Sequence, residues 1–122
     1  MPGVLVVDDS LATAVGVAAQ LTRAGYEPVQ VATGWAQCRS ALDHDAPALV
    51  ILDVHMAGTS GDILATQLKR DPRCAKTRIV LYSGSNVRDL QALARRCGAD
   101  GFVQKTSGAP LVPICTRLVP PR

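Results

Sequence analysis

Apolar residues along the chain fall into two alternating patterns: short unbroken runs and longer segments with a helical period. The unbroken runs lie at residues 4–7, 48–52 and 79–81, and they are rich in β-branched side chains. Such runs are typical of strands that are covered on both faces. Weaker strand candidates lie at residues 29–32 and 101–103. The pattern therefore predicts five short strands.

Between these runs, apolar residues recur every three or four positions, which predicts helices with one buried face. The recurring positions are Ala14, Val17, Ala18 and Leu21; Trp35, Cys38 and Leu42; Ile63, Leu64 and Leu68; and Leu90, Leu93, Ala94 and Cys97. A last helix would bury Leu111, Val112, Ile114, Cys115 and Leu118. Because Pro113 is tolerated only in a first turn, we expect this helix to begin late, at Pro110, and to be short.

Residues that cap or interrupt helices agree with this division of the chain. Ser10 and Thr33 stand where N-caps are expected, Gly25 and Gly98 where helices should end, and Asp71-Pro72 closes the third helical segment. Strands and helices that alternate with short connections predict an α/β fold: an open, doubly wound, five-stranded parallel sheet with helices on both faces.

Length and composition indicate one globular domain. At 122 residues, with 48% hydrophobic and 19% charged residues, the chain can bury a core without disulfides or metals. We expect a domain over residues 1–119, with residues 120–122 as a tail or the start of a linker. No apolar run approaches the length of a membrane span, and no leader pattern opens the chain. A cytoplasmic location without a membrane partner is therefore expected.

Charge and cysteine spacing argue against two classes of function. The net charge is only +3 and aromatic residues make up 3%, so we expect no direct nucleic-acid binding by this domain. Cys38, Cys74, Cys97 and Cys115 are far apart in the sequence. Such spacing suggests neither a zinc site nor a redox dithiol, and it favours reduced, buried thiols.

Polar residues whose side chains can bind a metal or take part in a reaction lie at the ends of four of the five predicted strands. Asp8 and Asp9 follow the first strand, Asp53 ends the third, Ser83 follows the fourth and Lys105 follows the fifth. Each one alone has an ordinary explanation, such as a helix cap, a turn or an exposed lysine. However, the carboxyl ends of parallel strands meet at one edge of the sheet, where α/β proteins place their sites. We therefore expect all five residues to converge there.

Three neighbouring carboxylates raise one another's proton affinity unless a cation neutralises them. Mg²⁺ (or Mn²⁺) suits such a site because it is hard, prefers oxygen ligands and keeps waters and phosphate oxygens in its coordination sphere. With a cation and Lys105 supplying positive charge, Asp53 could attack a phosphoryl group. The expected chemistry is the formation of a covalent aspartyl phosphate.

These residues make the chain resemble the receiver domain of two-component response regulators, from about Val4 to Leu118. The motifs that carry the resemblance are Asp8-Asp9, Asp53 in LVILDVHMAGTSG, Ser83 in IVLYSGS and Lys105 in GADGFVQK. The resemblance implies a flavodoxin-like sheet with strand order 2-1-3-4-5. It also implies a phosphorelay role, in which a histidine kinase or a phosphotransfer protein donates the phosphoryl group.

The resemblance assigns a role to each site residue. Asp53 would be the phosphoacceptor, Asp9 a direct metal ligand and Asp8 a ligand mostly through water. The backbone carbonyl of His55 would complete the protein ligands, and Lys105 would pair with the phosphoryl oxygens. The domain would not be an enzyme with turnover: its own chemistry would be limited to self-catalysed phosphotransfer and autodephosphorylation.

The resemblance also implies a switch. Ser83 would hydrogen-bond the phosphoryl group, and Phe102 would turn inward as the loop after the fourth strand moves; plain core packing of Phe102 is the alternative. The output surface would comprise the helix at Val87–Cys97 with the strand and helix that follow. A downstream effector domain or target protein would read this surface, and homodimerisation is left open.

The sequence departs from the family pattern at three positions. Thr106 replaces the usual proline after the lysine, so a cis bond there is not assured; Ala57 replaces another common proline; and Pro113 alters the last helix. His55 could overhang the phosphoryl site or face solvent, and Ser85 holds the other position of that kind.

Two other functions remain to be weighed. One is an interaction module that keeps the fold without phosphorylation, but such modules usually lose an acid or the lysine, and none is lost here. The other is an aspartyl-phosphate hydrolase of the dehalogenase type. That enzyme needs a second carboxylate two residues after the nucleophile, and His55 stands in that place.

Overall fold

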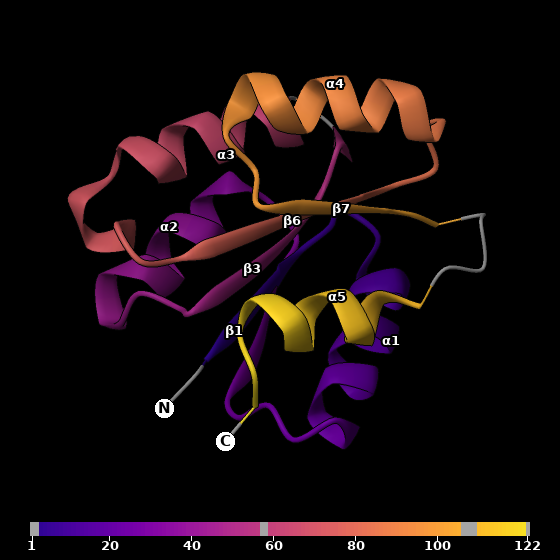
Figure 1. Cartoon of the computed structure of the whole chain (residues 1–122). Helices are drawn as coiled ribbons and strands as arrows, with labels where there is room; N and C mark the ends of the chain where they lie inside the picture. The colour runs from indigo at the N-terminus through magenta and orange to yellow at the C-terminus, as the bar shows by residue number, and fades with distance from the viewer. Residues whose placement is uncertain (1–2, 57–58, 106–109, 122) are drawn as a thin grey trace.

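Five parallel strands form the central sheet in the computed structural model, which describes residues 3–56, 59–105 and 110–121 (Figure 1). The strands are β1 (Val4–Val7), β2 (Val29–Ala32), β3 (Leu49–Asp53), β6 (Arg78–Ser83) and β7 (Gly101–Gln104). Their order across the sheet is β2-β1-β3-β6-β7. The predicted order 2-1-3-4-5 is confirmed, because β6 and β7 are the fourth and fifth strands of this sheet.

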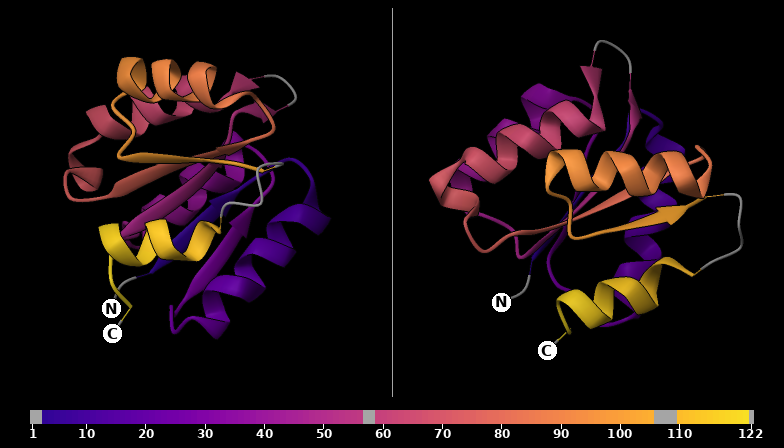
Figure 2. Two further views of the ribbon diagram at one scale, coloured as in Figure 1. Left: turned by 45° about the vertical axis from the view of Figure 1, so that its right-hand side comes forward. Right: turned by 45° about the horizontal axis from the view of Figure 1, so that its top comes forward.

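Within the described part of the chain, five α-helices cover the sheet in two layers, which confirms the doubly wound arrangement (Figure 2). The helices are α1 (Leu11–Arg23), α2 (Trp35–His44), α3 (Gly61–Arg70), α4 (Val87–Cys97) and α5 (Leu111–Leu118), and a short 3₁₀ turn, η1 (Pro72–Cys74), follows α3. Helices α1 and α5 lie on one face of the sheet, and α2, α3 and α4 lie on the other.

One hydrophobic core lies on each face of the sheet, which explains why the strands are unbroken apolar runs in the sequence. Successive strand side chains point to opposite faces, so Leu5 and Val7 pack under α2, α3 and α4, whereas Val4 and Val6 pack under α1 and α5. Every residue of β1 and β3 is buried. Both faces are therefore covered at these two strands, and polar residues follow β1 and end β3.

Helix ends mostly follow the caps expected from the sequence. Ser10 caps α1, Asp71 ends α3, and Gly98 ends α4 in the left-handed conformation with φ +78. The expectation for Thr33 was wrong, because the N-cap of α2 is Gly34. The Gln37 side chain instead reaches back and accepts hydrogen bonds from the Thr33 amide and hydroxyl at 2.6 and 2.9 Å.

The last helix begins at Leu111, so Pro113 falls in its first turn as predicted. Beyond the helix, the Tyr26 hydroxyl donates to the Val119 carbonyl. A Cβ at Gly25 would lie 3.4 Å from the side chain of Pro121. The described end of the chain therefore lies against the turn between α1 and β2, near the N-terminal end of β1 in Figure 1.

A small antiparallel hairpin follows β3 and was not predicted from the sequence. It pairs β4 (His55–Met56) with β5 (Thr59–Ser60). Gly61 follows it, and a Cβ there would overlap the backbone of Asp53 and Val54. Only glycine lets α3 begin this close to the end of β3. The departures noted at Ala57 and Thr106 lie outside the described residues.

All four cysteines are buried free thiols, as predicted. Burial raises the pKa of Cys38 to about 11 and the pKa of Cys115 to about 12, so both thiols stay protonated at neutral pH. Among the described residues, no helix is both long enough and apolar enough to cross a bilayer.

Candidate functional site

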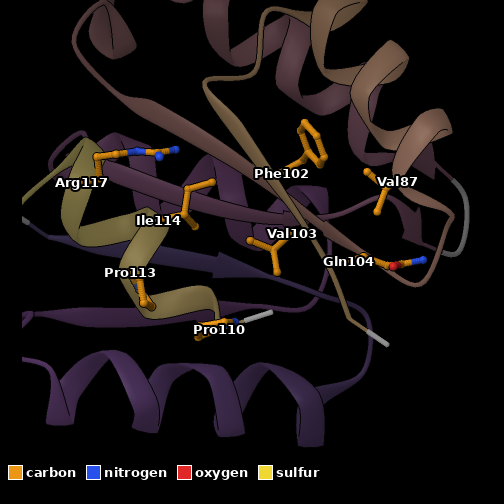
Figure 3. Close-up of a pocket in the computed structure, with 8 residues that line it drawn as sticks. All are labelled: Val87, Phe102, Val103, Gln104, Pro110, Pro113, Ile114 and Arg117. Atoms are coloured by element: carbon orange, nitrogen blue, oxygen red, sulfur yellow. The ribbon is translucent and has the colours of Figure 1, made fainter. Parts of the chain in front are cut away.

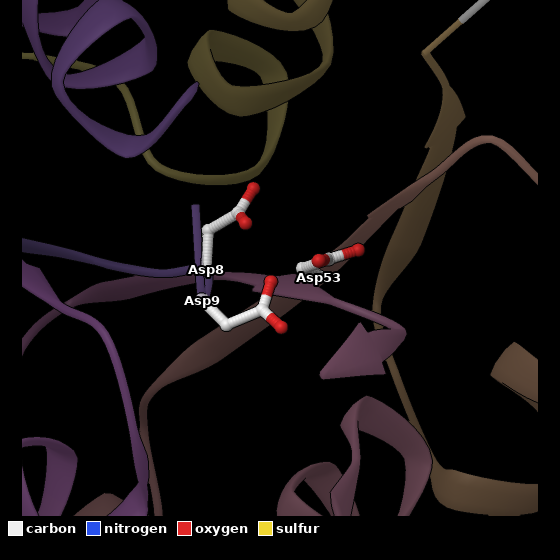
Figure 4. A group of neighbouring side chains, drawn as sticks. All are labelled: Asp8, Asp9 and Asp53. Carbon is white, nitrogen blue, oxygen red and sulfur yellow. The ribbon is translucent and has the colours of Figure 1, made fainter. Parts of the chain in front are cut away.

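Three carboxylates converge at the carboxyl edge of the sheet. One oxygen from each of Asp8, Asp9 and Asp53 lies within 4.8 Å of the other two (Figure 4). Asp8 and Asp53 are buried, whereas Asp9 is exposed. The structure thus brings together the acids of two separate strands, as the sequence predicted.

Strand register explains this convergence. Val7 of β1 lies beside Leu52 of β3, so the next residues along the two strands, Asp8 and Asp53, also become neighbours. The Asp8 amide extends the sheet by donating to the Ala32 carbonyl at 3.0 Å. Its side chain is fixed from the other direction, since the Ser10 amide donates to Asp8 Oδ1 at 2.9 Å.

Lys105 contributes a cation to this edge. Its Nζ lies 3.2 Å from Asp8 Oδ2 and 3.5 Å from Asp53 Oδ1. The Lys105 amide donates to the Ser83 carbonyl at 2.7 Å, which fixes the backbone from which the side chain extends. The Lys105 ammonium is paired with two of the three carboxylates, so the described side chains of this cluster carry an excess of negative charge.

The electrostatics of Asp53 reflect this excess. Burial raises the pKa of Asp53, the charge of Lys105 opposes the rise, and the neighbouring charge of Asp8 adds to it. The His55 amide donates to Asp53 Oδ1 at 3.3 Å and also works against the rise. The net effect is a pKa above the ordinary value for aspartate. An all-oxygen cluster that is short of positive charge fits a hard divalent cation.

A hydrogen-bonded chain runs along the same edge. The Ser83 hydroxyl donates to Ser85 Oγ at 3.2 Å, and the Ser85 amide donates back to Ser83 Oγ at 3.2 Å. Ser85 Oγ is also hydrogen-bonded to His55 Nε2 at 2.7 Å. The His55 imidazole therefore reaches across to the loop after β6. The backbone carbonyl of His55 stays a predicted metal ligand.

Phe102 lies away from the acids, on the face covered by α4. It is partly buried against the core of that face and helps to line a groove of about 350 Å³ with Val87 and Gln104 (Figure 3). The α5 side of the groove is formed by Pro110, Pro113, Ile114 and Arg117. Val103, the residue after Phe102, packs into the core on the opposite face of the sheet. A switching role for Phe102 stays a prediction.

Tyr82 is a neighbour of the site that the sequence did not predict. The Lys105 ammonium lies over the ring of Tyr82, 5.3 Å from its centroid. The only signal in the sequence was an aromatic residue directly before Ser83 in an otherwise aliphatic strand end. The hydrogen bond between His55 and Ser85 was likewise not predicted from the sequence.

Comparison with known proteins gives the family. The response regulator receiver domain model matches residues 4–112 of this chain. The chain belongs to the response regulator receiver domain family. The phosphate regulon transcriptional regulatory protein PhoB of Pseudomonas aeruginosa is 31% identical over 102 residues, which is 84% of this chain and 44% of that protein. The receiver domain described here therefore spans less than half of that relative's length.

Solved structures agree on the fold of this receiver domain. The chemotaxis protein CheY4 of Vibrio cholerae superposes with a TM-score of 0.87 at 23% identity, covering 98% of this chain and 99% of that one. The response regulator TrrA of Thermotoga maritima, in complex with Mg(2+)-BeF, has a TM-score of 0.82 at 24% identity and covers 98% and 100%. At these identities the similarity shows the shared fold.

Proposed function

We propose that this receiver domain takes a phosphoryl group onto Asp53 from a histidine kinase or a phosphotransfer protein in the cytoplasm. The observation that carries the proposal is the cluster itself: three carboxylates with oxygens within 4.8 Å of one another and Lys105 within ion-pair distance of two of them. The family membership supports a phosphorelay role for this cluster over that of a structural metal site.

In the proposed reaction, an Asp53 carboxylate oxygen attacks phosphorus and forms an O–P bond while the P–N bond of the donor phosphohistidine breaks. The bonding pair leaves with the imidazole nitrogen of the donor. Lys105 lies close enough to Asp53 to accompany the incoming negative charge. The hydrogen bond from the Lys105 amide to the Ser83 carbonyl holds the lysine on the β6 side of the site.

The acidic cluster fits Mg²⁺ or Mn²⁺. Asp8, Asp9 and Asp53 would hold the ion, with the His55 carbonyl as a further ligand. When bound, the cation supplies positive charge that offsets the repulsion between the carboxylates and the phosphoryl oxygens. The Mg(2+)-BeF complex of TrrA supports this choice of ion.

Phosphorylation would act as a switch through Ser83. The Ser83 hydroxyl is engaged with Ser85 in the structure, so new phosphoryl oxygens on Asp53 would compete for the same donor. Drawing Ser83 toward Asp53 would move the loop that leads into α4 and change the groove beside Phe102. The covalent charge favours this arrangement only because it binds Ser83 and Lys105 better there. An effector domain or target protein would read the altered surface.

The same edge would also set how long the phosphoryl group persists. Because the His55 imidazole is hydrogen-bonded to Ser85, it connects β4 with the loop after β6. This bridge would limit the approach of water to the aspartyl phosphate. The protein would then lose the group by slow autodephosphorylation and would not act as an enzyme with turnover.

The test is phosphorylation by a small donor. The protein is incubated with acetyl phosphate and Mg²⁺ and its mass is measured; we expect a gain of one phosphoryl group that is absent in Asp53→Asn. Asp45→Asn is the matched control, because Asp45 is an exposed acid that precedes β3 at the opposite edge. No gain at saturating donor would contradict the proposal and favour an interaction module that works without phosphorylation.

A further inference from the structure

We propose that Tyr82 is a positioning residue for Lys105, holding the ammonium at the acceptor carboxylate before the phosphoryl group arrives. This inference rests on the proposed function and adds to it a residue, Tyr82, to which the resemblance assigns no role. The observation is the placement of Lys105 Nζ over the Tyr82 ring, 5.3 Å from the centroid, while it also contacts Asp8 and Asp53.

The sheet register makes Tyr82 the residue that Lys105 must cross. Tyr82 of β6 lies between Asp53 of β3 and Val103 of β7, and it is paired in register with both. Tyr82 and Val103 pack on the face of α1 and α5. Asp53 continues the row of Leu49 and Ile51, which point to that face.

Lys105 follows β7, two residues after Val103, and therefore starts on the far side of β6 from the acids. Its ammonium nevertheless lies 3.5 Å from Asp53 and 3.2 Å from Asp8. To reach them, the side chain passes over the strand position held by Tyr82. The ring thus forms the surface along which the lysine reaches the acceptor.

Consecutive residues of β6 hold both ends of this lysine. The Ser83 carbonyl accepts the Lys105 amide at 2.7 Å, and the Tyr82 ring faces the ammonium. A cation within about 6 Å of an aromatic centroid is attracted by the negative face of the ring. This attraction offsets part of the rotamer entropy that a long lysine loses when it is held in one place.

An aromatic ring suits this task better than another carboxylate would. Asp8 and Asp53 are also candidate metal ligands, so Lys105 would share them with a bound cation. Tyr82 is neutral, and it attracts the ammonium without adding charge to an acidic cluster. A lysine already held in place adds its charge to the reaction without a costly rearrangement.

The first experiment measures the contact directly and does not depend on phosphorylation. In NMR spectra of the full chain, the ring current of Tyr82 should shift the Lys105 Hε protons upfield, with the signals assigned through Lys105→Met. We expect the shift to persist in Tyr82→Phe and to be lost in Tyr82→Leu. Ordinary Lys105 shifts in the wild type, or unchanged shifts in Tyr82→Leu, would overturn the inference.

The second experiment measures the consequence. With acetyl phosphate and Mg²⁺, Tyr82→Leu should be phosphorylated about three- to tenfold more slowly than the wild type, and Tyr82→Phe within about twofold of it. In a Lys105→Met background, Tyr82→Leu should cause no further loss. The same loss in both backgrounds would show a merely structural role and overturn the inference, as would a Tyr82→Phe variant as slow as Tyr82→Leu.

Two further comparisons keep the result interpretable. If Tyr82→Leu does not fold, Tyr82→Met replaces it and carries the same expectations, because it also lacks the ring. If the wild type gains no phosphoryl group, the proposed function fails while the NMR shifts still decide whether Tyr82 positions Lys105.

Discussion

The two edges of the sheet differ in how many positive or hydrogen-bond-donating groups surround each aspartate. At the carboxyl edge, Lys105 is shared between Asp8 and Asp53, and Asp9 lies beside them. At the amino edge, Asp100 alone accepts hydrogen bonds from Lys69 at 2.9 Å, Arg78 at 3.2 Å and the Ile79 amide at 2.8 Å. Among the described residues, one ammonium is shared between carboxylates at the carboxyl edge, whereas three donors surround the single carboxylate of Asp100 at the amino edge.

The pKa values follow this difference. Burial would raise the pKa of Asp100, but the hydrogen bonds from Lys69 and from the Ile79 amide outweigh it, and the pKa lies below the ordinary value. Burial raises the pKa of Asp53, and there Lys105 does not fully compensate. The two aspartates are similarly buried, so their partners decide the outcome. Asp100 has enough donors to stabilise its charged form, whereas the charged form of Asp53 is not fully compensated by Lys105.

The largest effect is expected from Asp100→Ala. It would leave Lys69 and the Ile79 amide without their shared acceptor, and we expect a loss of about 2 kcal/mol in the free energy of unfolding, measured by urea denaturation. Asp100→Asn is the matched control and should lose less, because an amide oxygen can still accept from Ile79. A loss no greater than for Asp45→Asn would contradict the importance given to this acid.

Metal binding is the next effect in size. Asp9→Asn should weaken Mg²⁺ binding by at least about tenfold, because it removes one charge of the three-acid cluster without altering the buried strands. Calorimetry or the fluorescence of Trp35 would measure the affinity. Asp100→Asn, at the other edge, should bind Mg²⁺ as the wild type does. An unchanged affinity in Asp9→Asn would separate that acid from the site.

A smaller effect, of opposite sign, is expected from Asp53→Asn. Since the folded-state pKa of Asp53 is raised, its favourable contribution is present at low pH and is lost as pH rises through that pKa. In metal-free buffer at neutral pH, the substitution should therefore raise the urea midpoint, by less than Asp100→Ala lowers it. Urea titrations should show this gain growing as pH rises above the ordinary pKa of aspartate.

Asp100 should give the opposite pH signature. Its folded-state pKa is lowered, so its stabilisation is present above the ordinary aspartate pKa and is lost as pH falls through the folded value. Urea midpoints of Asp100→Asn and the wild type should therefore converge on acidification. Parallel curves for the two substitutions would remove the electrostatic distinction between the edges.

The smallest effect is expected from the exposed ion pairs of the amino edge. Arg73 contacts Asp71 at 2.7 Å and Asp43 at 2.9 Å, but the guanidinium is open to solvent. Exposed pairs of this kind contribute little because water and salt screen them. Arg73→Ala should leave the urea midpoint within experimental error of the wild type. A clear drop would show that burial is not what separates the strong pairs from the weak ones.

Much of this receiver domain could be derived from the sequence. The apolar runs identified the strands of the sheet, helical periodicity identified the helices, and Pro113 fixed where α5 could begin. Because parallel strands end at a common edge, the positions of Asp8, Asp53 and Lys105 after their strands were enough to predict that they meet. These features depend on local pattern and on chain direction, which a sequence carries directly.

Contacts between side chains from different strands and loops were decided only by the tertiary structure. The Gln37 side chain displaced the expected cap at Thr33, a hairpin formed after β3, His55 met Ser85, and the Lys105 ammonium came to lie over Tyr82. The first two are local but depend on side-chain reach and backbone pairing that the pattern of residue types does not specify, and the last two join segments far apart in the chain. The sequence determined which chemical groups arrive at the edge of the sheet, and packing in three dimensions determined which of them touch.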